Sequence, residues 1–116
     1  MLSSFSQIQS MSYTTLLAAL ENGIYTITIN RPDKLNALNR DVFTDLNLAL
    51  DEIAANPDIK SVIITGAGPK AFVAGADISE FNSFSESEGA ALAQHGHDVF
   101  GSIENCSKPV IAAVNG

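Results

Sequence analysis

The chain has 116 residues and a mass of 12.2 kDa, the size of one small domain or of part of a larger one. Hydrophobic residues make up 46% and charged residues 16%, which excludes a wholly disordered chain because a core can form. The net charge of −7 disfavours a nucleic-acid groove, and the lack of an apolar run of about 18 residues predicts no membrane span.

The first twelve residues contain five serines and no charged side chain. They lack the basic residues of a secretory signal or a mitochondrial presequence. Residues 1–12 are therefore predicted to be a disordered extension, with Met11 as an alternative start, and residues 13–116 to be the folded part.

A β-hairpin is predicted next. The apolar run Leu16–Leu20 and the β-branched run Ile24–Ile29 flank the turn pair Asn22-Gly23, a strong hairpin signal. Pro32 follows the second run and cannot donate to a ladder, so the strand ends before it. Alternation places three residues on one face of this strand: Tyr25, Ile27 and Ile29.

A helix follows from the residues after Asn39, a plausible N-cap, to the breaker pair Asn56-Pro57. Asp41 and Asp45 lie near its start, where the helix dipole favours acidic side chains. Helical spacing gives it one apolar stripe, made by Phe43, Leu46, Leu50 and Ile53.

The rest of the chain alternates strand and helix. Val62–Thr65 and Pro109–Val114 are predicted to be strands buried on both faces, and Ala71–Val73 a short extended piece. A weaker helix is predicted from about Glu86 to Asn105, in which Gly96 and Gly101 lower the helix propensity. Its apolar face is predicted to hold Leu92, Val99, Phe100 and Ile103. This order predicts an α/β fold.

Small residues cluster at Ala74, Gly75 and Ala76, after the extended piece. They let another molecule approach the backbone, and a free backbone N–H at such a turn can stabilise a developing oxyanion. The residues alone also allow an ordinary strand-to-helix turn with Asp77 as N-cap, and most such turns are only structural.

The remaining candidates do not indicate a reactive site. The loop Gly66–Lys70 lacks the spacing of a phosphate-binding P-loop. His95 and His97 are two residues apart and face different sides of a helix, so no metal site is predicted. Cys106 is a lone cysteine, expected to pack as a small apolar residue in a reducing, cytoplasmic compartment. No pair of carboxylates indicates an acid/base couple.

Four ordered segments together resemble the enoyl-CoA hydratase/isomerase (crotonase) superfamily. They are Asn30-Arg31-Pro32 with Asn36-Ala37-Leu38, then Ser61–Gly66, then Lys70–Ile78 with its Ala74-Gly75-Ala76-Asp77-Ile78 core, and finally Lys108–Gly116. The resemblance covers about Leu16 to Gly116 and concerns the N-terminal half of that family.

The resemblance implies a spiral of ββα units, apparently truncated here, and a trimer or a pair of trimers. It implies an acyl-CoA thioester as substrate, with coenzyme A part of the substrate and no separate cofactor. The thioester oxygen would lie between two backbone N–H groups, the first being that of Ala76. The coenzyme A site would be lined by Ala74, Asp77 and Ile78, and its nucleotide end by Lys34 and Leu35.

The sequence also departs from the family pattern. By the resemblance, the second N–H donor and the catalytic glutamates would lie after Gly116, and Ser79 stands where several hydratases carry a lysine. We therefore expect a parent enzyme that hydrates 2-enoyl-CoA and a chain that has no hydratase turnover by itself. The alternatives are a relative of another reaction type (isomerase, hydrolase, dehalogenase or ring-closing) and a non-catalytic fragment that binds coenzyme A or packs against another chain.

Overall fold

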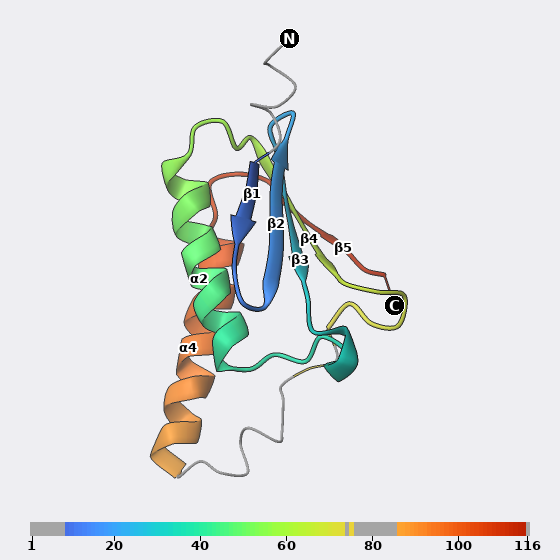
Figure 1. Cartoon of the computed structure of the whole chain (residues 1–116). Coiled ribbons are helices and arrows are strands. Elements are labelled where there is room, and N and C mark those ends of the chain that lie inside the picture. The colour runs from blue at the N-terminus through green and yellow to red at the C-terminus, as the bar shows by residue number, and fades with distance from the viewer. Residues whose placement is uncertain (1–8, 74, 76–85, 116) are drawn as a thin grey trace.

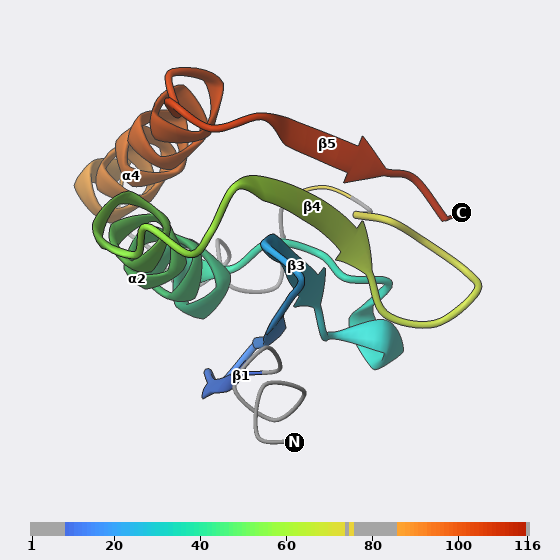
Figure 2. The ribbon, with the colours of Figure 1, turned by 90° about the horizontal axis from the view of Figure 1, so that it is seen from above.

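The computed structural model describes residues 9–73, 75 and 86–115 of the chain. The described strands form one mixed sheet in the order β1-β2-β3-β4-β5, and helices α2 and α4 lie together on one side of it (Figures 1 and 2). This arrangement confirms the predicted α/β class. The element bounds are β1 Gln9–Ser12, β2 Leu16–Glu21, β3 Ile24–Ile29, the 3₁₀ turn η1 Pro32–Lys34, α2 Arg40–Ala55, β4 Ser61–Gly66, α4 Glu86–Glu104 and β5 Val110–Ala113.

The predicted hairpin is confirmed. Strands β2 and β3 are antiparallel, with Leu20 opposite Tyr25. Asn22 and Gly23 both have positive φ, 54° and 82°, which is the left-handed geometry that a tight hairpin turn requires. The three alternating residues of β3 that were predicted to share a face are all buried.

The N-terminal boundary differs from the prediction. Gln9–Ser12, inside the stretch predicted to be a disordered extension, forms β1 and pairs antiparallel with β2. Its register sets Gln9 opposite Leu20 and Ser12 opposite Leu17. Backbone pairing does not depend on charged or apolar side chains, so the composition of this stretch did not reveal it. Residues 1–8 lie outside the described part.

Helix α2 begins where predicted. The Asn39 side chain accepts a hydrogen bond from the Val42 amide at 3.0 Å, which is the expected N-cap contact. Of the predicted apolar stripe, Phe43, Leu46 and Ile53 are buried and Leu50 is half-buried. Asp45, predicted near the helix start because of the helix dipole, has its carboxylate buried against Thr15.

Strands β3, β4 and β5 run parallel to one another. The prediction of a buried strand is wrong for β5, in which Ile111 is 57% exposed. In β4, Val62 is buried and Ile63 half-buried, and no residue is exposed. The helices cover one face of the described sheet, and β5 is its edge, so alternate side chains of both strands face outward. The short segment Ala71–Val73 forms no strand.

Helix α4 matches its predicted bounds within one residue and packs against α2. Leu92 and Val99 are buried, but Phe100, predicted on the same apolar face, is 48% exposed. Gly96 lies where the Phe43 ring reaches α4, and a Cβ at this position would fall 2.7 Å from that ring. The glycine therefore lets the two helices approach closely.

Candidate functional site

Three parallel strands end at the same edge of the sheet. The ends of β3 and β4 are aligned, with Ile29 opposite Gly66, and Thr65 lies opposite Ala113 near the end of β5. The crevice outside the carboxyl ends of parallel strands is the usual ligand position in α/β folds. Two of the segments that resemble the family follow these strands at this edge: Asn30–Leu38 after β3 and Lys70–Val73 after β4.

The side chain of Asn36 joins two of these segments. It is fully buried, and its Nδ2 donates to the carbonyls of Ala67 at 3.0 Å and Ala71 at 2.8 Å. Its Oδ1 accepts from the Arg31 amide at 2.9 Å. The donors and the acceptor of this amide are therefore all used to hold the loop after β3 against the loop after β4.

Asn36 and its neighbour Leu35 both have left-handed backbones, with φ of 58° and 53°. Asparagine tolerates this region, but leucine adopts it at a cost of about 1–2 kcal/mol. The Leu35 side chain is also 46% exposed, so it has no core contact to offset that cost. Strained, exposed residues of this kind cluster at ligand sites.

The backbone of Leu38 anchors the small-residue turn. Its N–H donates to the carbonyl of Gly75 at 2.6 Å. Gly75 has a φ of 114°, which a residue with a side chain rarely adopts, and a Cβ there would meet nothing within 4 Å. The glycine is therefore needed for its backbone conformation and not for space.

A second asparagine holds the loop after β4 from the β5 side. The Asn115 Nδ2 donates to the carbonyls of Gly66 at 2.8 Å and Gly68 at 2.6 Å, and its Oδ1 accepts from the Gly66 amide at 3.2 Å. The side chain thereby continues the β4–β5 pairing beyond Ala113.

A cleft of about 300 Å³ lies between the two asparagine-linked loops. Leu35 and Asp33 contribute to one wall, and Lys70 and the Ala67–Pro69 segment to the other. Lys34 is exposed at the end of η1, next to the lining. The lining thus combines an exposed apolar side chain with one lysine, Lys70, and one aspartate, Asp33. The apolar group and the ammonium suit a ligand with both aromatic and anionic parts.

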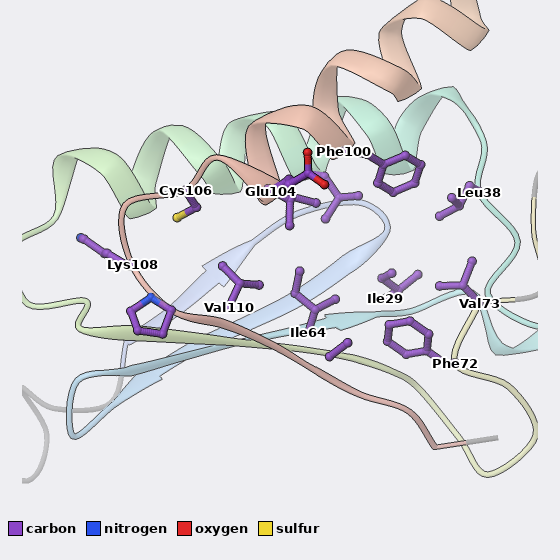
Figure 3. A pocket seen from close by; sticks show the side chains of 14 residues that line it. Ile29, Leu38, Ile64, Phe72, Val73, Phe100, Glu104, Cys106, Lys108 and Val110 are labelled. Atoms are coloured by element: carbon purple, nitrogen blue, oxygen red, sulfur yellow. The ribbon is translucent and has the colours of Figure 1, made fainter.

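A larger cavity of about 630 Å³ lies between α4 and the sheet. Figure 3 shows Leu38, Phe72 and Val73 at one end of it and Cys106 and Lys108 at the other. Its lining is mainly apolar, and the Lys108 ammonium is bound by the carbonyls of Ile53 and Asn56. The cavity therefore offers space for apolar groups but no acid/base couple among the described residues.

The predicted site residues fall into two groups. Lys34 and Leu35 are described: Leu35 lines the cleft, and Lys34, its neighbour in the chain, is exposed. Their predicted contacts with a nucleotide stay predictions. Ala74, Ala76, Asp77, Ile78 and Ser79 lie outside the described residues, so their predicted roles stay predictions. Gly75, inside that motif, is described and is held by Leu38.

Sequence reasoning missed the roles of Asn36 and Asn115. Both were quoted only as letters of a motif. The one available signal was that asparagine, among non-glycine residues, tolerates a left-handed backbone, and this applies to Asn36 alone. Apart from Arg31, five residues before Asn36, their partners lie 31 to 50 residues away in the chain, beyond the reach of local patterns.

The other candidates occupy ordinary structural positions. His97 is exposed, whereas His95 is half-buried, and its ring packs against Phe43 with centroids 6.0 Å apart. Cys106 is half-buried beside the core. Within residues 9–73, 75 and 86–115 there is no cluster of three metal-ligating side chains, and no helix there is long and apolar enough to cross a membrane.

Comparisons with known proteins agree on one family. A family model described as enoyl-CoA hydratase/isomerase matches residues 19–116. The chain is 43% identical over 106 residues to a short-chain-enoyl-CoA hydratase of Clostridium acetobutylicum and 41% identical over 106 residues to a crotonyl-CoA hydratase of Syntrophomonas wolfei. Each match covers 91% of this chain and 41% of the relative, so the chain spans less than half of their length.

Solved structures give the same result. The chain superposes on an enoyl-CoA hydratase/carnithine racemase from Magnetospirillum magneticum with a TM-score of 0.86 and 34% identity, covering 100% of this chain and 43% of that one. An enoyl-CoA hydratase from Geobacillus kaustophilus matches with a TM-score of 0.85 and 28% identity, covering 90% of this chain and 39% of that one. The fold is therefore the crotonase-like one that the motifs implied, present in part.

Proposed function

Because the chain belongs to the enoyl-CoA hydratase/isomerase family, we propose that it carries the acyl-CoA-binding part of an enzyme that hydrates 2-enoyl-CoA. The chain spans about 41% of the hydratases it resembles, so catalysis is assigned to the parent enzyme. Coenzyme A is part of the substrate, and no further cofactor is proposed.

The anchored turn at Gly75 is the observation that carries the proposal. In a trans peptide the carbonyl and the following N–H point in opposite directions. The Gly75 carbonyl is bound by the Leu38 amide at 2.6 Å. For Ala76 to bind an oxyanion, its N–H must be available to a ligand. The hydrogen bond from Leu38 to the Gly75 carbonyl, which belongs to the peptide group between Gly75 and Ala76, supports this arrangement. Such a donor typically contributes about 3–4 kcal/mol to a transition state.

The cleft supports the nucleotide end of the proposed site. Leu35 is exposed and strained at its wall, Lys70 also lines it, and Lys34 is exposed next to Leu35 in the chain. An exposed leucine can cover one face of an adenine ring, and ammonium groups suit phosphates. We therefore propose that the nucleotide of coenzyme A occupies the cleft and that its thioester end reaches the Ala74–Ile78 segment.

The chain by itself is proposed to bind the thioester without turnover. The resemblance assigns the second N–H donor and the catalytic glutamates to the region after Gly116, and general acid/base catalysis needs a carboxyl group close to the reacting carbons. A homo-oligomer of the trimeric kind and a reducing, cytoplasmic location complete the proposal. The single cysteine, Cys106, supports the reducing location.

A calorimetric titration of the purified chain with crotonyl-CoA, followed by a hydration assay of the same sample, tests the proposal. We expect saturable binding and no hydration above a buffer control. Absence of binding would favour the alternative of a packing fragment. Hydration well above the control would show that the chain is a complete catalyst and would contradict the division of roles.

A further inference from the structure

We infer that Asn36 and Asn115 are positioning residues that hold the loop Gly66–Ala71 from the β3 side and from the β5 side and thereby fix one wall of the cleft proposed for the nucleotide end of the ligand. The inference rests on the proposed acyl-CoA function. It concerns how the ends of β3, β4 and β5 are kept in register around a bound ligand, and neither residue is assigned a contact with that ligand.

The geometry on the β3 side carries the first half of the inference. Asn36 is fully buried and makes hydrogen bonds of 2.8 to 3.0 Å to both loops that flank the cleft. Two residues along the chain, Leu38 binds Gly75. One short segment therefore fixes the loop of Leu35, the loop after β4 and the start of the small-residue turn together.

The geometry on the β5 side carries the second half. Asn115 bonds to the amide and the carbonyl of Gly66 and to the carbonyl of Gly68. These contacts tie the end of β5 to the same loop that Asn36 holds. The loop is thus fixed by two side-chain amides that approach from two different strands.

Gly66 shows how tightly the two sides meet. A Cβ at this position would fall 2.7 Å from the Asn36 Nδ2 and 2.7 Å from the Ala71 carbonyl. The Gly66 backbone therefore lies in close contact with Asn36, and a residue with a side chain does not fit between them. Either amide, once removed, leaves the loop held from one side.

Asp variants test the inference, because aspartate keeps the acceptor and loses both N–H donors. In Asn36→Asp, an ionised carboxylate would face the carbonyls of Ala67 and Ala71, and burial would raise its pKa. Protonation restores one donor, so the defect should diminish as the pH falls. Asn47→Asp is the matched control, since Asn47 is exposed on α2.

Two probes separate the two ends of the site: adenosine 3′,5′-bisphosphate for the nucleotide end and crotonyl-CoA for the whole. We expect Asn36→Asp to bind both probes about tenfold more weakly at pH 8 and to recover most of the loss at pH 5.5. Asn115→Asp is expected to weaken the binding of both probes as well, because Asn115 holds Gly68, which lines the cleft. A general loss of stability would not produce this pH profile, and Asn47→Asp should bind both probes as the unmodified chain does.

Hydrogen exchange in the ligand-free chain makes the inference testable without ligand binding. The Leu38 amide should exchange faster in Asn36→Asp than in Asn47→Asp, and the Ala67 amide, which binds the Ile29 carbonyl, should exchange faster in Asn115→Asp. Unchanged exchange at both amides, or equal affinities in all variants, would overturn the inference. If the amides exchange faster in the variants as expected but the unmodified chain binds neither probe, the result would instead contradict the proposed function.

Discussion

The Asp45 carboxylate accepts two hydrogen bonds from one residue, Thr15, whose amide and hydroxyl both lie 2.8 Å from Oδ2. Both residues are buried, with 7% and 6% of their surface exposed. The contact ties the connection between β1 and β2 to the second turn of α2. It is therefore a packing link between the hairpin layer and the helix layer.

Removing this carboxylate should destabilise the chain. Asp45→Ala leaves a buried amide and a buried hydroxyl without partners, and we expect a loss of about 2–4 kcal/mol in the free energy of unfolding. Urea denaturation measures it. Asp51→Ala, an exposed aspartate in the same helix, is the control and should change stability by less than about 0.5 kcal/mol. Equal effects of the two substitutions would contradict the role of Asp45.

Two glycines of α4 should respond in opposite ways to alanine. Gly96→Ala places a Cβ 2.7 Å from the Phe43 ring, so the helices must separate, whereas a Cβ at Gly101 meets nothing within 4 Å. We expect Gly101→Ala to stabilise the chain by about 0.5–1 kcal/mol through helix propensity and Gly96→Ala to destabilise it by about 1–3 kcal/mol through overpacking.

Thermal unfolding of both glycine variants and of Gly96→Ala combined with Phe43→Leu checks this prediction. The smaller leucine should relieve part of the Gly96→Ala defect. Stabilisation by Gly96→Ala alone would show that α2 and α4 are not in close contact at this point.

These elements show which parts of the fold local patterns could predict. The β2–β3 hairpin and α2 were predictable because Asn22-Gly23 and Asn39 act through hydrogen bonds and backbone angles within a few residues. The exposure of β5 was not, because the burial of a strand depends on what lies against it. Gly96 lowered the predicted helix propensity, yet a glycine is required there because the Phe43 ring, 53 residues earlier in the chain, leaves no space for a Cβ.

The candidate site divides in the same way. The small residues indicated the turn at Ala74–Ile78, and the family resemblance assigned it a role and added the Lys34-Leu35 pair. The links that hold these segments, through Asn36, Leu38 and Asn115, are long-range contacts that only the folded chain brings together.

Tyr25 should make stability fall at alkaline pH. Its side chain is 1% exposed, and burial, with a smaller contribution from the Tyr13 hydroxyl 3.4 Å away, raises its pKa well above the usual value of about 10. Above that value an unfolded tyrosine releases its proton while the folded one keeps it. The stabilisation is therefore fully present below about pH 10 and is lost as the pH rises above it.

Denaturant titrations between neutral and alkaline pH measure this effect in the unmodified chain and in Tyr25→Phe. The unmodified chain should lose up to about 1.4 kcal/mol per pH unit more than the variant once the pH exceeds about 10. Parallel stability curves for the two proteins would contradict the assignment to Tyr25.

The outer face of β5 should promote self-association. Ile111 is 57% exposed and Val114, directly after β5, is 67% exposed. In the described sheet, β5 is an edge strand that pairs with β4 on one side only. Exposed apolar edge strands are templates for pairing with another chain, and a lysine at the edge opposes it. Ile111→Lys should shift the chain toward monomer in light scattering, whereas Leu48→Lys, at an equally exposed leucine of α2, should not. Identical mass distributions for the two variants would contradict this role of β5.

The most direct test of the account follows the Ala76 amide by NMR during titration with crotonyl-CoA and, separately, with coenzyme A, which has no acyl carbonyl. If the Ala76 N–H binds the thioester oxygen, its resonance moves downfield with crotonyl-CoA and stays nearly unchanged with coenzyme A, while residues at the cleft respond to both. An Ala76 resonance that is unmoved by crotonyl-CoA at saturation would contradict the central claim.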